Sequence, residues 1–148
     1  MLFRSRRTSV NLCATNGVHA KPVVGGIARV EIFDSYLFKN GNGVKVEDNS
    51  NCSVEHSVSL NNTGDGFLSF SNGGGVDMLV DSSEAAHNGG SGVHTSGGNA
   101  SLRVTSSIVT GNAVGATASG GQLATFQDNV LVANTSNGAF NTFLVRNQ

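Results

Sequence analysis

The chain of 148 residues carries a net charge of −1, with 38% hydrophobic residues, 13% charged residues, 20 glycines and a single proline. This composition excludes collagen, which needs plentiful proline, and it disfavours a long helical bundle and a disordered chain. The charge gives no support for nucleic-acid binding, and no apolar run approaches the roughly 18 residues that span a bilayer.

The first 27 residues contain a degenerate copy of the pattern that recurs further along the chain. The basic stretch at residues 1–7 is followed by no apolar segment, so we predict no signal peptide. Ser9, Ala14 and Gly17 keep the spacing of the later repeats without their asparagine. We expect residues 1–27 to form a degenerate first coil or the N-terminal edge of the repeat array.

Five repeats of one pattern occupy residues 28–140. In each repeat apolar residues alternate, a serine or asparagine follows, an asparagine comes five residues later, and a glycine closes the repeat. The first polar row contains Ser35, Ser57, Ser83, Ser107 and Asn129, and the asparagine row contains Asn40, Asn62, Asn88, Asn112 and Asn134. Recurrence at intervals of 22 to 26 residues indicates a repeat protein.

Each repeat is predicted to hold three short strands, because its apolar residues alternate with the period of a strand. The inward residues expected for the first strand are Val30/Ile32, Cys52/Val54, Met78/Val80, Leu102/Val104 and Ala124/Phe126. Those of the second are Tyr36/Phe38, Val58/Leu60, Ile108/Thr110 and Val130/Val132, and those of the third start at Val44, Phe67, Val93, Ala116 and Ala139. Such strands bury a face only when their equivalents stack, which gives an all-β parallel β-helix of about five to six coils.

Three residues conflict with the predicted facing of these strands. Glu84 falls at an inward position, where an unpaired carboxylate is not tolerated, so we predict a local shift of strand register in the third coil. Leu68 and Phe70 point outward in the second coil. A slipped register is the favoured explanation for them, and a small contact patch is the alternative.

The polar rows are expected to mark the corners of the coils. Asparagine tolerates left-handed backbone and bonds to neighbouring backbone groups, which suits a sharp bend. Asparagines stacked in successive coils also form ladders of amide hydrogen bonds in parallel arrays. We therefore predict a ladder along at least one of the two rows.

The strings SYLFKNGNGV, SVSLNNTGDGF and SIVTGNAVG resemble the right-handed parallel β-helix proteins of the pectin-lyase-like superfamily. They are especially similar to uncharacterised β-helix-repeat proteins of bacteria. The resemblance implies a right-handed coil of three parallel sheets and, in many members, carbohydrate binding or cleavage on an outer face. Relatives of this type are often exported, so the cellular location stays open.

The catalytic motifs of that superfamily are missing from the sequence. The pectin hydrolases carry Asn-Thr-Asp, Asp-Asp, Gly-His-Gly and Arg-Ile-Lys, and none of these strings occurs here. The Trp-x-Asp-His segment of several pectate lyases is excluded because the chain has no tryptophan. Since a fold does not imply an activity, these absences favour a scaffold without catalysis.

One constellation of charged residues remains as a candidate site. Glu55 and Asp81 occupy equivalent outward positions in neighbouring coils, about 5 Å apart at the backbone. Because like charges destabilise such a pair, the two carboxylates are candidates for a Ca²⁺ site or a catalytic pair, with Arg103 as the basic residue. The alternative, which we favour, is a solvated face on which Arg103 neutralises Asp81. No other metal or cofactor is predicted, and His87 and His94 are assigned to a glycine-rich turn.

The expected function is that of a non-catalytic β-helix scaffold that binds carbohydrate or another surface. A polysaccharide lyase, glycoside hydrolase or epimerase is the alternative. Residues 141–148 are predicted as a C-terminal tail that opens with one more strand, and the pattern is typical of the C-terminal part of a longer β-helix. Exposed coil edges favour self-association through the N-terminal face.

Overall fold

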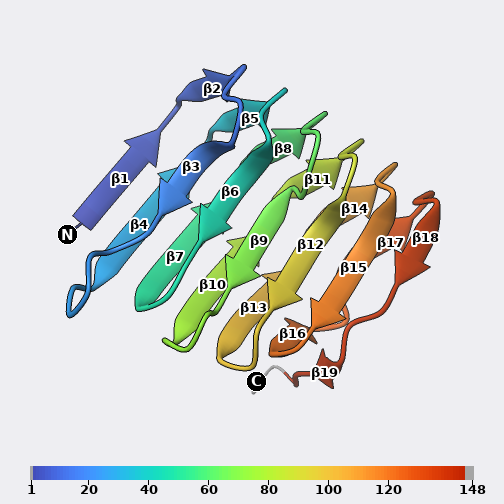
Figure 1. The fold of residues 1–148 in the computed structure, drawn as a ribbon. Coiled ribbons are helices and arrows are strands. Elements are labelled where there is room, and N and C mark those ends of the chain that lie inside the picture. Colours follow the sequence, from blue (N-terminus) through green and yellow to red (C-terminus); the bar gives the residue numbers. More distant parts are fainter. Residues whose placement is uncertain (1, 146–148) are drawn as a thin grey trace.

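The chain winds into a parallel β-solenoid in the structure, which is a computed structural model that describes residues 2–145 (Figure 1). Strands and turns alternate along these residues, and none of them forms a helix. The described part of the chain accordingly offers no helix that is long and apolar enough to cross a membrane. The predicted all-β fold is confirmed, while residues 146–148 of the predicted tail lie outside the described residues.

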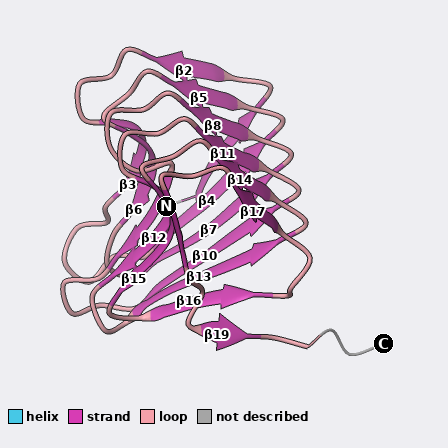
Figure 2. Cartoon of the chain, turned by 90° about the vertical axis from the view of Figure 1, so that its right-hand side faces the viewer, coloured by secondary structure: helices cyan, strands magenta, loops and turns pink. Residues whose placement is uncertain are grey.

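Three parallel sheets run along the solenoid, and each of the first six coils contributes one strand to every sheet (Figure 2). Sheet A contains β1 (Leu2–Arg6), β4 (Ala28–Phe33), β7 (Ser50–Glu55), β10 (Val76–Asp81), β13 (Ala100–Thr105), β16 (Gln122–Thr125) and β19 (Thr142–Phe143). Sheet B contains β2 (Ser9–Asn11), β5 (Tyr36–Phe38), β8 (Val58–Leu60), β11 (Glu84–Ala86), β14 (Ile108–Thr110) and β17 (Val130–Val132). Sheet C contains β3 (Asn16–Ala20), β6 (Asn42–Val46), β9 (Phe67–Phe70), β12 (Ser91–Ser96), β15 (Val114–Ser119) and β18 (Ser136–Gly138).

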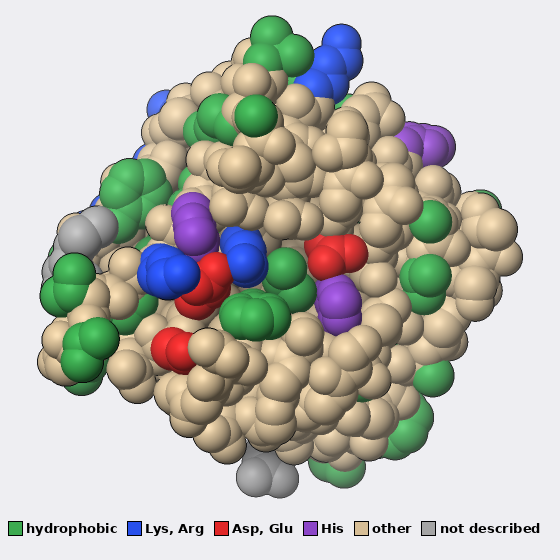
Figure 3. Space-filling view, viewed as in Figure 1, with side chains coloured by type: hydrophobic (Ala, Val, Ile, Leu, Met, Phe, Trp, Pro, Cys, Tyr) green, Lys and Arg blue, Asp and Glu red, His purple; other side chains and the backbone are tan. Residues whose placement is uncertain are grey.

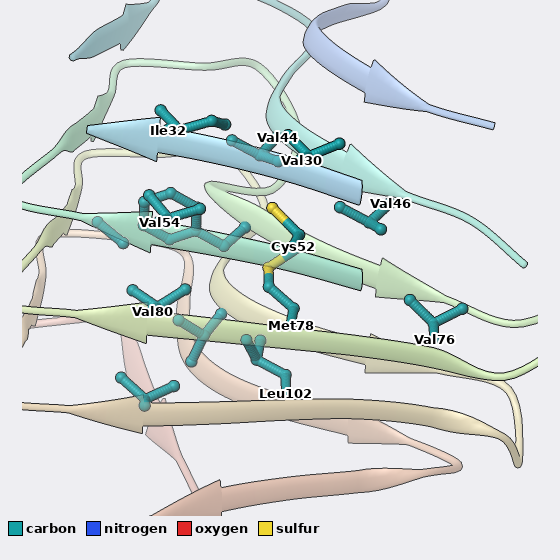
Figure 4. Close-up of a cluster of buried hydrophobic side chains, with 14 of the residues drawn as sticks. Val30, Ile32, Val44, Val46, Cys52, Val54, Val76, Met78, Val80 and Leu102 are labelled. Atoms are coloured by element: carbon teal, nitrogen blue, oxygen red, sulfur yellow. The ribbon is translucent and has the colours of Figure 1, made fainter. Parts of the chain in front are cut away.

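The core is the apolar interior that the three sheets enclose (Figure 4). The inward columns predicted for sheet A are buried from the second to the fifth coil, namely Val30, Ile32, Cys52, Val54, Met78, Val80, Leu102 and Val104. Sheet C adds Val44, Phe67, Val93 and Ala116, again as predicted. Burial raises the pKa of the Cys52 thiol to about 12, so this residue packs as a small neutral side chain.

The predicted facing of sheet B is wrong, and its strands present the opposite residues to the core. Leu37, Ser59, Ala85 and Val109 at the strand centres are buried, whereas Tyr36 is 58% exposed and Ile108 is 44% exposed. The reason is the buried serine of the first polar row, which directly precedes strands β5, β8, β11 and β14. Because Ser35 faces inward, the period of two places Leu37 inward as well.

Two predicted register shifts are also wrong. Glu84 pairs in regular register with Val58 and Ile108, and it points outward because sheet B faces the other way. Leu68 lies in regular register between Lys45 and His94, so the coil that contains β9, which is the second of the five predicted repeats, has not slipped. Leu68 and Phe70 lie on the outer face of sheet C, and their role as a small contact patch stays a prediction.

The first and last coils differ from the predicted alignment by one residue. In the first coil Thr8 and Cys13, rather than Ser9 and Ala14, donate their N–H groups to the row side chains of Ser35 and Asn40 at 3.3 and 3.0 Å. In the sixth coil Leu123 and Thr125 occupy the positions that Leu102 and Val104 hold in the fifth, so the prediction of Ala124 and Phe126 is wrong.

The last strand of sheet C shows a similar offset. Gly138, rather than the predicted Ala139, pairs with Ala116. Ala139 itself is exposed.

Both polar rows form ladders, which confirms and extends the predicted asparagine ladder. The N–H groups of Ser35, Ser57 and Ser83 each donate to the hydroxyl of the next row serine at 3.1 Å. In the asparagine row, the N–H group of each residue donates to the side-chain oxygen of the next from Asn40 to Asn134, at 2.9–3.1 Å.

The residue before nine of the ten row positions has a positive φ, which makes the corner of the coil. Asn129 is the exception, because there the positive φ lies two residues earlier, at Gln127. Non-glycine residues at these corners include Asp34 and His56 before the serine row and Asn61 and His87 before the asparagine row. Left-handed backbone is unfavourable for such residues, so the ladder bonds hold the chain in a conformation that it would otherwise avoid.

The N-terminal end of the solenoid is formed by its first coil and by residues 21–27, which follow that coil. The sheets begin there with the edge strands β1, β2 and β3. A cavity of about 530 Å³ lies between them and is lined by apolar side chains that include Phe3, Val10 and Val18. Self-association through this face remains a prediction.

Candidate functional site

The outer face of sheet C gathers charged, histidine and apolar side chains in one patch (Figure 3). Its central row consists of residues in register on successive strands, namely His19, Lys45, Leu68, His94 and Thr117. Glu47, Asp65, Phe70 and Ser119 lie beside this row and contact its members. We call these nine residues the sheet C face.

A carboxylate with three basic partners forms one end of the sheet C face. Glu47 is only 8% exposed. Its Oε1 atom lies 3.1 Å from His19 Nε2 and 2.6 Å from Lys45 Nζ, and its Oε2 atom lies 3.1 Å from Lys21 Nζ. Burial alone would raise the pKa of Glu47, but hydrogen bonds from Lys45, Lys21 and His19 outweigh burial and lower the pKa to about 2.

The aromatic ring of Phe70 connects this charged cluster to the middle of the face. Lys45 Nζ lies 4.7 Å from the centre of the Phe70 ring, which is the geometry of a cation–π contact. Leu68 is largely covered, while Phe70 remains half-buried. The face therefore presents an apolar ring beside a cation.

A chain of three side chains forms the other end of the face. His94 Nδ1 lies 2.8 Å from Asp65 Oδ2, and His94 Nε2 lies 3.2 Å from Ser119 Oγ. The imidazole thus bridges a carboxylate and a hydroxyl through its two different nitrogens. Asp65 and His94 are half-buried, whereas Ser119 is exposed.

Asp65 is positioned by a third set of ladder bonds, which the sequence analysis did not find. The side-chain amide of Asn42 donates to Asn16 Oδ1 at 2.9 Å, and its Oδ1 atom accepts the N–H group of Asp65 at 2.8 Å. Asp65 Oδ1 in turn accepts the N–H group of Ser91 at 2.7 Å. A Cβ atom at Gly90 would lie only 2.5 Å from that oxygen, so a glycine is required there for the close approach.

A sequence signal for this third ladder exists. Its members are the residues that directly precede the row glycines, such as Asn16, Asn42 and Asp65. His94 follows its own row glycine by two residues and lies on strand β12, not in a turn as predicted.

The candidate residues from the sequence lie on a different face, the outer side of sheet A. Asp81 pairs with Glu55 in register, as expected from the repeat. Each carboxylate accepts a hydrogen bond from a nearby serine, Ser53 Oγ to Glu55 at 2.8 Å and Ser82 Oγ to Asp81 at 2.9 Å.

Arg103 does not join this pair. Its Nη2 atom lies 2.6 Å from Asp77 Oδ2, so the proposed neutralisation of Asp81 by Arg103 is not found. Among residues 2–145, no group of three or more His, Cys, Asp or Glu side chains has an arrangement that would hold a metal ion. A Ca²⁺ ion at Glu55 and Asp81 would therefore find no third His, Cys, Asp or Glu ligand among the described residues.

The outer face of sheet B, in contrast, is mainly apolar. Its exposed side chains include Tyr36, Ile108, Val130 and Val132. The sheet C face thus joins ionic side chains, an aromatic ring and hydroxyl groups in one patch.

Comparison with known proteins agrees with this architecture. A family model described as a right-handed beta helix region matches residues 5–136. No curated protein and no solved structure matches the chain.

Proposed function

The chain belongs to the right-handed β-helix family, and we propose that it is a scaffold that binds a polysaccharide on the sheet C face without cleaving glycosidic bonds. The observation that carries this proposal is the mixture of side chains on that face. Phe70 offers an apolar ring, Lys45 and His94 offer polar groups, and Thr117 and Ser119 offer hydroxyls. Binding sites for small polar ligands combine apolar surface with a few convergent polar groups in this way.

The repeat of the solenoid supports an elongated ligand. Equivalent strands of sheet C follow one another at about 4.8 Å, so the face offers related positions along its length. Its side chains are held in place by ion pairs and hydrogen bonds within the protein, as Glu47 holds Lys45 and Asp65 holds His94. A preorganised surface loses less entropy when a ligand binds.

The alternative function is a polysaccharide lyase, glycoside hydrolase or epimerase that uses Glu55 and Asp81. The register that stacks the two carboxylates is its only structural support. Because Arg103 bonds to Asp77 instead, no ion pair among residues 2–145 gives Glu55 or Asp81 a basic partner for proton abstraction.

Retention on immobilised polysaccharides tests the proposal. Affinity electrophoresis with a panel of uronate and neutral polysaccharides should show retention of the native protein on at least one of them. F70A should lose most of this retention, whereas Y36A, which removes an exposed aromatic ring from sheet B, should keep it. Absence of retention throughout the panel, or equal losses in both variants, would contradict the proposal.

An assay of chain cleavage distinguishes the alternative. Incubation with uronate polymers and calcium should produce no absorbance from unsaturated products. If such activity appeared and D81A abolished it, the lyase function would replace the proposed one.

A further inference from the structure

We propose that Asp65, His94 and Ser119 form a nucleophilic site that hydrolyses short-chain acyl esters. This activity goes beyond binding of a polysaccharide and does not depend on it. The three residues come from three successive coils, with Asp65 in the turn before β9, His94 on β12 and Ser119 at the end of β15.

The hydrogen bonds assign a role to each nitrogen of His94. An ionised carboxylate only accepts hydrogen bonds, so the contact of 2.8 Å to Asp65 Oδ2 places the ring proton on Nδ1. Nε2 is then an acceptor, and the hydroxyl of Ser119 donates to it at 3.2 Å. This is the order carboxylate, imidazole and hydroxyl in which serine hydrolases activate their nucleophile.

The carboxylate is fixed independently of the histidine. Asp65 Oδ1 accepts the N–H group of Ser91 at 2.7 Å, which leaves Oδ2 directed to His94. Since the N–H group of Asp65 is itself bonded to Asn42, the carboxylate is held at both its backbone and its side chain. Such support keeps the imidazole oriented towards Ser119.

The nucleophile is accessible and lies next to free backbone donors. Ser119 is exposed, and Gly120 and Gly121 follow it with φ values of 85° and 76°. Within the described residues, the N–H groups of these two glycines donate no hydrogen bond. The N–H group that follows the nucleophile is a common donor to the oxyanion in acyl transfer.

The reaction balances with water as the only co-reactant. Ser119 Oγ attacks the ester carbonyl carbon while its proton moves to His94 Nε2, and Asp65 stabilises the imidazolium. The carbon–oxygen bond to the alcohol then breaks, and the alcohol leaves with the proton from His94. A water molecule attacks the acylated serine while its proton moves to His94 Nε2. The bond between the acyl carbon and Ser119 Oγ then breaks, His94 returns the proton to Ser119 Oγ, and the carboxylic acid is released. Because Ser119 lies on an open surface, acetyl and other short acyl groups are the substrates that fit.

A fluorophosphonate probe tests the nucleophile directly. Mass spectrometry of the labelled native protein should place the phosphonyl group on Ser119, and p-nitrophenyl acetate should be hydrolysed. S119A and H94Q should abolish the labelling and reduce hydrolysis by about tenfold or more. S82A is the matched control, because Ser82 is an exposed serine that bonds to a carboxylate, Asp81, without a histidine. This variant should label and react as the native protein does.

Several outcomes would overturn the assignment. Absence of labelling, labelling at another serine, or hydrolysis by S119A at the rate of the native protein would each remove it, provided that circular dichroism shows the variants folded. Retention on polysaccharides is measured separately, so failure of the ester assay leaves the binding proposal to stand on its own test.

Discussion

Asn62 and Asn88 are joined by two hydrogen bonds to a single oxygen, since the N–H group and the Nδ2 atom of Asn62 both donate to Asn88 Oδ1, at 3.1 and 2.9 Å. Both side chains are buried. Each coil is therefore tied to the next at its corner by a side chain as well as by the sheets.

Removal of one ladder residue should destabilise the whole solenoid. In N88L, the N–H group of Asn62 loses its acceptor, and the Ser59 carbonyl loses the donor that lies 3.1 Å away. The expected loss in free energy of unfolding is about 2 kcal/mol or more, because these groups remain buried without partners. N72L changes an exposed turn residue and should be nearly neutral. Equal midpoints of chemical unfolding for the two variants would contradict the ladder account.

Neighbouring residues of strand β5 should respond very differently to truncation. Leu37 is 1% exposed and faces the core, so L37A should lower the free energy of unfolding by about 2–5 kcal/mol. Tyr36 points outward, and Y36A should lower it by about 1 kcal/mol or less. Urea titrations would measure both, and a larger loss for Y36A would restore the facing expected from the sequence.

A buried hydroxyl offers a stabilising substitution. Within the described residues the Thr95 hydroxyl has no hydrogen-bond partner, although the residue is completely buried. T95V keeps the shape of the side chain and should raise the free energy of unfolding by about 1 kcal/mol. Its neighbour in register, Ser69, donates to the Ser101 carbonyl at 3.1 Å, so S69A should lower stability instead. Calorimetry that found T95V less stable than the native protein would point to a partner for this hydroxyl.

The ion pairs of Glu47 make stability depend on pH in the acid range. The pKa of Glu47 is lowered from 4.5 to about 2 in the folded protein, so its ionised form favours folding above pH 4.5. This contribution is lost as the pH falls from 4.5 towards 2. The difference in free energy of unfolding between the native protein and E47Q should therefore shrink over that interval. A difference that stayed constant with pH would show that Glu47 is not stabilised by its basic partners.

Much of the fold could be predicted because the same pattern of apolar and polar residues recurs in each repeat. The fixed spacing of five residues from Ser57 to Asn62 and from Ser83 to Asn88 indicated where the coils bend. The alternation of Val30 and Ile32 indicated which residues of sheet A face the core. The facing of sheet B was missed because its strands have apolar residues at their outer positions. The buried serine before β5, β8, β11 and β14, rather than hydrophobicity, determines which of their residues face the core.

The sheet C face could not be predicted in the same way. Asp65 and His94 are separated by 29 residues and contact each other only because consecutive coils stack. Coil lengths differ, so neighbours across coils follow from the register of each pair of strands and not from a constant interval. Glu55 and Asp81 were identified because they occupy the same position in the repeat, whereas Asp65, His94 and Ser119 occupy three different positions.

Nuclear magnetic resonance titration with fragments of the best-retained polysaccharide tests most directly that function lies on the sheet C face. Backbone amide shifts should change at Lys45, Phe70, His94 and Thr117 and in the turns beside them. Amides of Glu55 and Asp81 on sheet A, and of Tyr36 on sheet B, should remain unchanged. Shifts centred on either of those two faces, or no shifts at saturating ligand, would contradict the account.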